Sequence, residues 1–333
     1  MDCRFRDKIP VHHIAKGLID THAILVDRNT LRRTGHRRGG KSTVIDVPLE
    51  RIAGLVDKEG ERGADIIALP ETCRGQSNNT QEGLDGPTIS AMSRLAAKHR
   101  TYLVCPIDRK DGDVRLNSAV LLDRRGQIAI VYDKMYPFAF DEFAKRPGVH
   151  PGQAVRVFQA DFGRVGLAIC FDVNWAPVWE RLSDLGAELV IWPSAYSAGR
   201  SLQARAIDFN YYVMSATWVP DCLVFDIDGE QLLYEHNNLS DGTNVTRFTF
   251  DLDRCLFHQD INLPAKLAKL LKERGDDVER EKWLPKEGWF LLKAKRPGIS
   301  ARALARQYGL EERRPYINRT RCDVDKARGW QFS

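Results

Sequence analysis

The chain has 333 residues, of which 43% are hydrophobic and 29% charged, and its formal net charge is +5 at pH 7. This composition is typical of a globular protein with one large domain and extensions, or with two domains. No run approaches the roughly 18 apolar residues that a membrane span needs, so we expect no membrane partner. So small a net charge also gives no reason to expect a nucleic-acid partner.

Seven cysteines are scattered along the chain and form no Cys-x-x-Cys pair. An odd, scattered set argues against a disulfide framework and against a zinc site. The first 25 residues lack the apolar core of a secretory signal peptide. We therefore expect a cytoplasmic protein with reduced thiols and no metal.

Residues 1–45 form an N-terminal segment that is partly irregular and basic, and Ala23-Ile-Leu-Val26 is a candidate for the first strand. Residues 28–41 contain six basic side chains, with no interleaved aromatic residue and no helical period. Nucleic-acid binding through this segment is one alternative. We favour a solvated loop or arm.

From Val47 onward, helices and strands alternate. The apolar periodicity predicts helices over residues 48–60, 88–99, 179–185 and 202–210. It predicts strands over residues 66–69, 102–107, 117–122, 128–133, 165–170, 189–192, 211–216 and 248–252, with short strands 224–227 and 231–234 around the turn Asp228-Gly229. Continuous apolar strands between helices are typical of a sheet that helices cover, so the class is α/β or α+β with enough strands for two sheets.

The composition changes beyond Asp253. Residues 263–274 and 301–309 are predicted as amphipathic helices, and we expect the charged, Trp-containing segment 275–295 to link them. The sequence of the second helix weakly resembles one helix of a DNA-binding helix-turn-helix. We favour the alternative that this region is a helical tail, which packs on the body or on a partner subunit. We place the domain boundaries near residues 45 and 255.

Four polar residues follow the ends of predicted strands and are candidates for catalysis. Glu71 follows strand 66–69, Lys134 follows strand 128–133, Glu142 lies in the next loop, and Cys170 ends strand 165–170. Loops at one edge of a sheet converge, so we expect these groups to meet. A thiol can act as nucleophile, a carboxylate can carry its proton, and an ammonium can stabilise an oxyanion.

Each of these residues also has a structural alternative. Free cysteine is commonly buried as a small hydrophobe, so Cys170 alone would be weak evidence. Glu71 and Lys134 could form a surface ion pair that contributes little, and Glu142 could be one more loop carboxylate.

Three segments, Gly63-Ala-Asp-Ile-Ile-Ala-Leu-Pro-Glu71, Tyr132-Asp-Lys134 and Gly166-Leu-Ala-Ile-Cys-Phe-Asp172, resemble in order the three signatures of the nitrilase superfamily of carbon–nitrogen hydrolases. Residues 84–87, 117–119 and 204–213 are similar to further recurrent segments of that family. The resemblance runs from about Val47 to Leu252.

This resemblance implies a four-layer α-β-β-α sandwich over residues 46–255, with residues 256–333 as a C-terminal extension. By position, Glu71 would be the general base, Lys134 the oxyanion stabiliser, Cys170 the nucleophile and Glu142 a supporting carboxylate. No metal or organic cofactor is implied. The family also implies a homodimer or higher homo-oligomer that pairs near residues 175–185, with C-terminal tails crossing over.

The residues after the nucleophile, Phe171-Asp172, resemble amidases and carbamoyl-amide hydrolases, whereas true nitrilases place Trp-Glu there. We therefore expect hydrolysis of a linear amide or N-carbamoyl compound through a cysteine thioester, releasing ammonia or an amine. A nitrile hydrolase and a catalytically silent scaffold are the alternatives. Candidate substrate-binding residues are Phe171, Asn174, Trp175 and Tyr196, with core packing as an equal alternative for the last two. Asp172 is expected to cap the following turn.

Overall fold

The computed structural model describes residues 18–26, 46–76, 79–138, 148–219, 222–232, 235–238 and 243–329. The basic segment 28–41 and Glu142 lie outside the described residues, so nothing is added to the predictions made for them. The chain divides into two compact units, a body (Ile19–Phe250) and a C-terminal unit (Asp251–Ser333). Each unit is described by itself.

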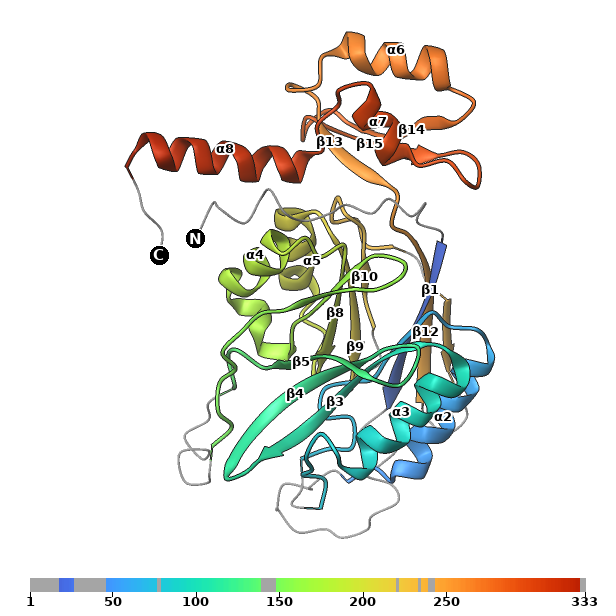
Figure 1. Cartoon of the computed structure of the whole chain (residues 1–333), viewed down its shortest axis with the longest axis vertical. Helices are drawn as coiled ribbons and strands as arrows, with labels where there is room; N and C mark the ends of the chain where they lie inside the picture. The colour runs from blue at the N-terminus through green and yellow to red at the C-terminus, as the bar shows by residue number, and fades with distance from the viewer. Residues whose placement is uncertain are drawn as a thin grey trace. The chain divides into compact units, whose positions relative to one another are not determined.

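The first sheet of the body has seven strands in the order β11-β12-β1-β2-β3-β4-β5 (Figure 1). They are β1 (Leu18–Val26), β2 (Ile66–Ala68), β3 (Tyr102–Asp111), β4 (Val114–Leu122), β5 (Ile128–Asp133), β11 (Glu235–Asn238) and β12 (Thr243–Asp251). Strands β1 to β3 run parallel, and β3 to β5 run antiparallel. The helices α2 (Leu49–Glu61) and α3 (Pro87–His99) cover one face, where Ile52 and Met92 share a core with Ile67 and Leu103.

The second sheet has five strands in the order β10-β9-β8-β7-β6. They are β6 (Val157–Gln159), β7 (Arg164–Leu167), β8 (Leu189–Ser194), β9 (Tyr212–Thr217) and β10 (Val224–Phe225). The helices α4 (Ala176–Asp184) and α5 (Gly199–Phe209) share a core with this sheet. A Cβ on Gly166 of β7 would lie 2.7 Å from Cδ2 of Leu182, so this glycine allows α4 to approach the strand closely.

Aromatic contacts join the two sheets face to face. The rings of Tyr212 in β9 and Phe250 in β12 have centroids 4.9 Å apart, and those of Tyr102 in β3 and Phe158 in β6 are 6.2 Å apart. With helices on the outer face of each sheet (Figure 1), the body is a four-layer α-β-β-α sandwich. The predicted fold is confirmed.

Several element boundaries differ from the prediction. The strand expected over residues 165–170 ends at Leu167, and Cys170 opens the 3₁₀ turn η3 (Cys170–Asn174). The backbone stays extended as far as Ile169, with φ −120° and ψ 122°, and turns at Cys170, which has a left-handed φ of 44°. Of the strand expected over 231–234, the first residue, Gln231, makes only an isolated bridge to Phe225, and the last two lie outside the described residues. The strand expected over 23–26 is part of the longer β1, and the one expected over 248–252 is the end of the longer β12, except for Leu252, which lies in the turn after it.

The C-terminal unit is an antiparallel three-stranded sheet with helices. Its strands are β13 (Cys255–His258), β14 (Val278–Leu284) and β15 (Trp289–Ala294), in the order β13-β15-β14, and its helices are α6 (Pro264–Arg274), α7 (Ala301–Gln307) and α8 (Arg313–Ala327). The helices expected at 263–274 and 301–309 are present, but the expectation that 275–295 is only a link was wrong. Leu270 of α6 and Leu304 of α7 pack in one hydrophobic core with Phe290 and Leu292 of β15. This packing fixes the position of β15 against the two helices.

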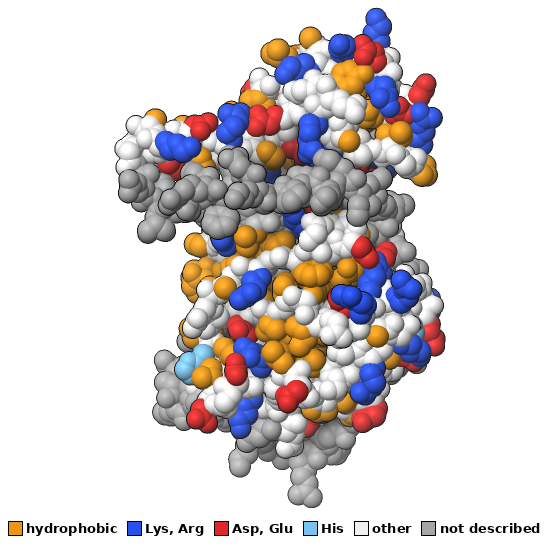
Figure 2. Space-filling model, viewed as in Figure 1, with side chains coloured by type: hydrophobic (Ala, Val, Ile, Leu, Met, Phe, Trp, Pro, Cys, Tyr) orange, Lys and Arg blue, Asp and Glu red, His pale blue; other side chains and the backbone are white. Residues whose placement is uncertain are grey.

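The charges of the C-terminal unit are mixed in sign. Figure 2 shows basic and acidic side chains interspersed over the visible face of this unit. Many are paired, for example Arg319 with Glu311 and Arg254 with Glu281. In both units, no described helix is long and apolar enough to cross a membrane.

Candidate active site

Glu71 lies three residues after the end of β2 and is only 6% exposed. Its Oε1 accepts hydrogen bonds from Lys134 Nζ at 2.7 Å and from Asn117 Nδ2 at 2.8 Å. Its backbone carbonyl accepts a bond from the indole N–H of Trp218. Thr72, the next residue, has a φ of 43°, so the chain turns sharply just after the carboxylate. These contacts hold the carboxylate in one orientation.

Lys134 follows β5 directly and is 3% exposed. Its backbone N–H donates to the carbonyl of Asn117 at 2.8 Å, so Asn117 holds both members of the ion pair. Burial lowers the pKa of Lys134, but the negative charge of Glu71 and the hydrogen bond to it act in the opposite direction, and the pKa is raised. Lys134 is therefore a cation at neutral pH. The alternative of a surface ion pair is wrong, because both side chains are buried.

Cys170 lies at the first position of η3, where its left-handed φ stores backbone strain of the order of 1–3 kcal/mol. Burial, followed by the charge of Glu71, raises the pKa of the Cys170 thiol to about 12. Lys134, the N–H of Ala195 and the side chain of Ser194 act in the opposite direction. The resting thiol is thus protonated at neutral pH, and attack by its sulfur requires a base.

Asp172, two residues after Cys170, is fully buried. Its carboxylate accepts hydrogen bonds from Ile169 N at 3.0 Å, from Tyr136 N at 2.8 Å and from the hydroxyl of Tyr132 at 2.6 Å. Ile169 precedes η3, so the carboxylate of Asp172 caps the start of its own turn and not, as predicted, the turn that follows. The other two bonds reach a different part of the chain, 36 and 40 residues away.

The predicted substrate-binding residues lie around the nucleophile. Phe171 and Trp175 have ring centroids 4.8 Å apart, and Asn174 Nδ2 donates to the carbonyl of Phe171 at 3.1 Å. Burial raises the pKa of Tyr196, and the side chain of Asn174 acts on it in the opposite direction; Tyr196 is 38% exposed. Core packing, the alternative for Trp175 and Tyr196, does not describe them, because both are partly accessible.

Two further rings extend this group. Tyr136 stacks on Trp175 with centroids 4.3 Å apart and an interplanar angle of 2°, and Phe138 packs edge-on against Phe171 at 4.8 Å. We call the four rings the aromatic wall: Tyr136, Phe138, Phe171 and Trp175. Phe138 is 42% exposed, so the wall is open to solvent at one end.

Sequence reasoning missed the residues that orient the candidate catalytic groups. Asn117 and Tyr132 were noted only as members of family-like segments, and Ser194 was not singled out. Asn117 carried a signal, since its polar side chain stands at the start of the predicted strand 117–122, whose last four residues are apolar. The contact of Ser194 with Cys170 depends on the pairing of β7 with β8, which the sequence does not give.

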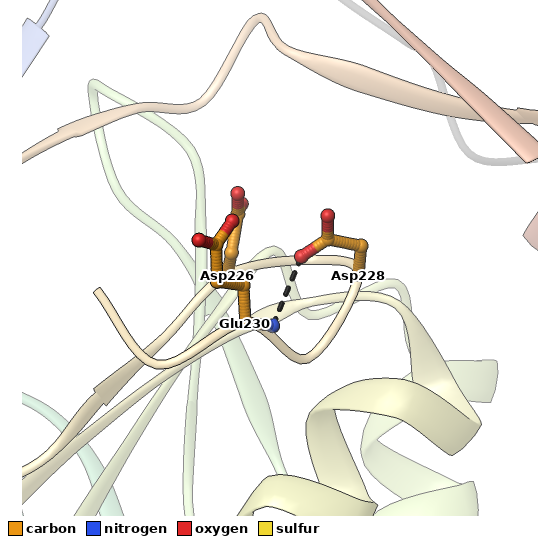
Figure 3. A group of neighbouring side chains, drawn as sticks. All are labelled: Asp226, Asp228 and Glu230. Carbon is orange, nitrogen blue, oxygen red and sulfur yellow. Dashed lines mark hydrogen bonds between the residues drawn. The ribbon is translucent and has the colours of Figure 1, made fainter. Parts of the chain in front are cut away.

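A cluster of three carboxylates lies apart from these residues, at the turn after β10 (Figure 3). Oxygen atoms of Asp226, Asp228 and Glu230 all lie within 4.8 Å of one another. Asp226 Oδ1 accepts from Ile227 N at 2.7 Å, and Asp228 Oδ1 accepts from Glu230 N at 3.0 Å. These hydrogen bonds orient the carboxylates of Asp226 and Asp228 within the turn, and since exposed acidic groups are common without an ion, we assign no metal to the cluster.

Known proteins share both the sequence pattern and the fold of the body. The family model described as carbon-nitrogen hydrolase matches residues 40–243. The chain is 30% identical over 190 residues, 51% of its length, to the nitrilase and fragile histidine triad fusion protein NitFhit of Drosophila melanogaster; the match spans less than half, 41%, of that relative. It is 26% identical over 195 residues, 53% of its length, to omega-amidase NIT2 of Xenopus tropicalis, of which the match covers 70%.

Among solved structures, a mutant of the amidase from Nesterenkonia sp. AN1 has the same fold. Its TM-score is 0.57 at 17% identity, and the match covers 75% of this chain and 98% of that one. The family model spans more than half of the chain, and its matched range holds Glu71, Lys134 and Cys170. The chain therefore belongs to the carbon–nitrogen hydrolase family, within the nitrilase superfamily, and is an enzyme of the carbon–nitrogen hydrolase class.

Proposed function

We propose that this enzyme hydrolyses a linear, non-peptide amide or N-carbamoyl compound through a thioester on Cys170. One observation carries the proposal: a buried carboxylate–ammonium pair, Glu71 and Lys134 at 2.7 Å, acts electrostatically on the Cys170 thiol. Burying such a pair costs free energy that packing alone does not require. A chemical role explains why the pair is retained, and it argues against a silent scaffold.

In the first half of the reaction, the Cys170 sulfur attacks the carbonyl carbon of the substrate. Because the resting thiol is protonated, Glu71 accepts its proton as the C–S bond forms. The carbonyl oxygen becomes an oxyanion, and the ammonium of Lys134 stabilises it. The proton held by Glu71 passes to the leaving nitrogen, the C–N bond breaks, and ammonia or an amine departs.

In the second half, water attacks the acyl-thioester. Glu71, again a carboxylate, accepts a proton from that water, and Lys134 stabilises the second oxyanion. When the C–S bond breaks, the proton returns to the sulfur of Cys170, and the carboxylic or carbamic acid is released. The supporting role of Glu142, implied by the family resemblance, stays a prediction.

We propose that the non-reacting part of the substrate lies against the aromatic wall. Phe171 adjoins the nucleophile in sequence, and Tyr136 is two residues from Lys134, so the wall begins where the reacting carbon must lie. Rings that already pack on one another offer a rigid apolar surface at little entropic cost. An uncharged alkyl or aryl substituent fits this surface.

Two of the relatives support an amide substrate over the nitrile alternative. One is named an omega-amidase, and the other is the Nesterenkonia amidase, whose mutant shows the result of Michael addition of acrylamide at the active-site cysteine. The residues after the nucleophile, Phe171-Asp172, resemble those of amidases, which also favours an amide substrate. The same three catalytic groups could also hydrate a nitrile, so nitriles belong in the test.

The test is ammonia release from matched aliphatic amides, N-carbamoyl amines, N-carbamoyl amino acids and nitriles. We expect turnover of an amide or N-carbamoyl compound, and loss of activity by about 10⁴-fold or more in Cys170→Ala. Turnover of nitriles alone would favour the nitrile alternative. Activity that persists in a folded Cys170→Ala protein would refute the mechanism.

Two expectations from the sequence extend this proposal. From the family resemblance we propose a homo-oligomer, and a monomer in light scattering would contradict it. The cytoplasmic location stays a prediction that fractionation of the source cells would test.

A further inference from the structure

Asp172 bonds to both catalytic segments at once. Tyr132 precedes Lys134 by two residues and Tyr136 follows it by two, and Asp172 accepts a hydrogen bond from each. Ile169, the third donor, immediately precedes Cys170. One carboxylate thus holds the chain by hydrogen bonds on either side of Lys134 and just before Cys170. We call this set of three hydrogen bonds the clamp.

The backbone of Asp172 fixes the same region to the helical layer of the second sheet. Its carbonyl accepts a hydrogen bond from the indole N–H of Trp179 in α4 at 2.9 Å and from the N–H of Trp175 at 3.1 Å. Asp172 is fully buried, and its hydrogen bonds reach α4, the turn η3 and the exit of β5. A side chain held on so many sides is well placed to fix geometry and poorly placed to touch the substrate.

We infer that Asp172 is a positioning residue, which sets the distance between the Lys134 ammonium and the Cys170 thiol. This inference rests on the proposed roles of those two residues. Without the carboxylate, the exit of β5 and the nucleophile turn would be joined by weaker contacts, and each could shift independently. Misplacement of a catalytic group by about 1 Å can reduce the rate about a hundredfold.

The positioning requires the ionised carboxylate. Three N–H or O–H donors point at its two oxygens, and a protonated carboxyl would turn one oxygen into a donor. Burial raises the pKa of Asp172 to about 6, while the bond from Tyr132 and the charge of Lys134 act in the opposite direction. Tyr132 and Lys134 are thus the titratable side chains on β5 and its exit that act on this carboxylate. As the pH falls through about 6, Asp172 takes up a proton and the clamp weakens.

The experiment compares Asp172→Asn, Tyr132→Phe and the matched control Asp253→Asn, a buried aspartate of the C-terminal unit. For a small amide, we expect Asp172→Asn to lower kcat about ten- to a hundredfold with KM changed less than about threefold. Tyr132→Phe removes the bond that lowers the pKa of Asp172, so the acidic limb of its kcat profile should move to higher pH. Asp253→Asn should change neither quantity.

A merely structural role for Asp172 would leave the acidic limb of Tyr132→Phe in place, and that result would overturn the inference. Wild-type kcat in a folded Asp172→Asn protein would overturn it too. If Asp172→Asn does not fold, Tyr132→Phe carries the test.

Failure of the proposed function is recognised separately, by wild-type protein that hydrolyses none of the compounds. The rate of alkylation of Cys170 by iodoacetamide, followed by mass spectrometry from about pH 5 to 9, then replaces kcat. An altered rate in Asp172→Asn and an unaltered one in Asp253→Asn would still support the positioning role, and equal rates would refute it.

Discussion

Two buried aspartates, one in each unit, have different roles: Asp253 holds the start of a helix, and Asp172 joins two segments of the candidate active site. Burial raises the pKa of both Asp172 and Asp253. Asp253 accepts bonds from Ser300 Oγ and Ala301 N, which are neighbours at the start of α7, so it holds one helix end. Asp172 accepts from two separate segments that carry the lysine and the cysteine. The positions of its partners, and not its burial, connect Asp172 to catalysis.

The same contrast applies to other residue types. In the body, polar and aromatic side chains converge on Cys170, whereas in the C-terminal unit their counterparts bond within that unit. We therefore expect substitutions in the body to change catalysis, and matched substitutions in the C-terminal unit to change at most stability. A loss of kcat in any C-terminal variant would contradict this and show that the unit contributes to the site.

The largest effect is expected for Glu71→Gln. The amide keeps the shape of the side chain but cannot accept the proton of Cys170, so kcat should fall about 10³-fold or more. Initial rates of ammonia release measure it, with circular dichroism to verify the fold. The control is Glu311→Gln, which removes the exposed pair with Arg319 and should leave kcat unchanged. A Glu71→Gln protein with wild-type kcat would exclude Glu71 as the base.

A smaller effect is expected for Asn117→Ala. This change removes the bond to Glu71 Oε1 but leaves the backbone contact with Lys134, so kcat should fall about tenfold while the ion pair persists. The control is Asn262→Ala. Asn262 is also buried, and its side chain bonds the backbone of His258 and Glu311 within the C-terminal unit.

Asn262→Ala should cost about 1–3 kcal/mol of stability, measured by urea unfolding, without changing kcat. If both asparagine variants lost activity equally, the effect of Asn117→Ala could not be assigned to Glu71.

Trp175→Ala should change substrate preference more than rate. Loss of the ring opens the aromatic wall, so KM for a phenyl-bearing amide should rise about tenfold, while KM for acetamide should stay within about twofold. Each variant is measured on both substrates, so the small amide is an internal control. Trp283→Ala, at an exposed ring of the C-terminal unit, should alter neither. Equal changes on both amides would place the substituent elsewhere.

The smallest effect concerns pH and stability. Asp172 has a pKa of about 6 in the folded protein against an ordinary value of 3.8. The folded state therefore binds its proton more tightly than the unfolded state, and folding stability falls as pH rises through this window. The proton of Asp172 therefore lowers the free energy of unfolding by about 1.4 kcal/mol when the pH rises from about 5 to about 7.5.

Urea unfolding of the wild type and of Asp172→Asn at both pH values isolates this contribution. The stability difference should shift in favour of the variant as pH rises. A shift of the opposite sign would mean that the folded protein stabilises the charged form of Asp172.

The order of helices and strands in the body was largely predictable, because its strands are continuous apolar runs bounded by turns. Ile66 to Leu69 and Leu189 to Trp192 are such runs, and their burial on both faces is what a sandwich requires. One strand of the C-terminal unit, β14, was missed for a physical reason. Strand β14 is an edge strand, and its residues Glu279, Arg280 and Glu281 are exposed, which removes the apolar signal.

The sequence by itself determined which groups are available for chemistry. The carboxylate, ammonium and thiol could be picked out because each follows the end of an apolar strand, and their order in the chain pointed to the family. Only the tertiary structure decided how they are oriented. Asn117 reaches Glu71 across 46 residues, and Asp172 reaches Tyr132 across 40, through contacts between strands and turns that no local pattern specifies. Local periodicity reports the face that a residue occupies, whereas its hydrogen-bond partners depend on how distant segments pack.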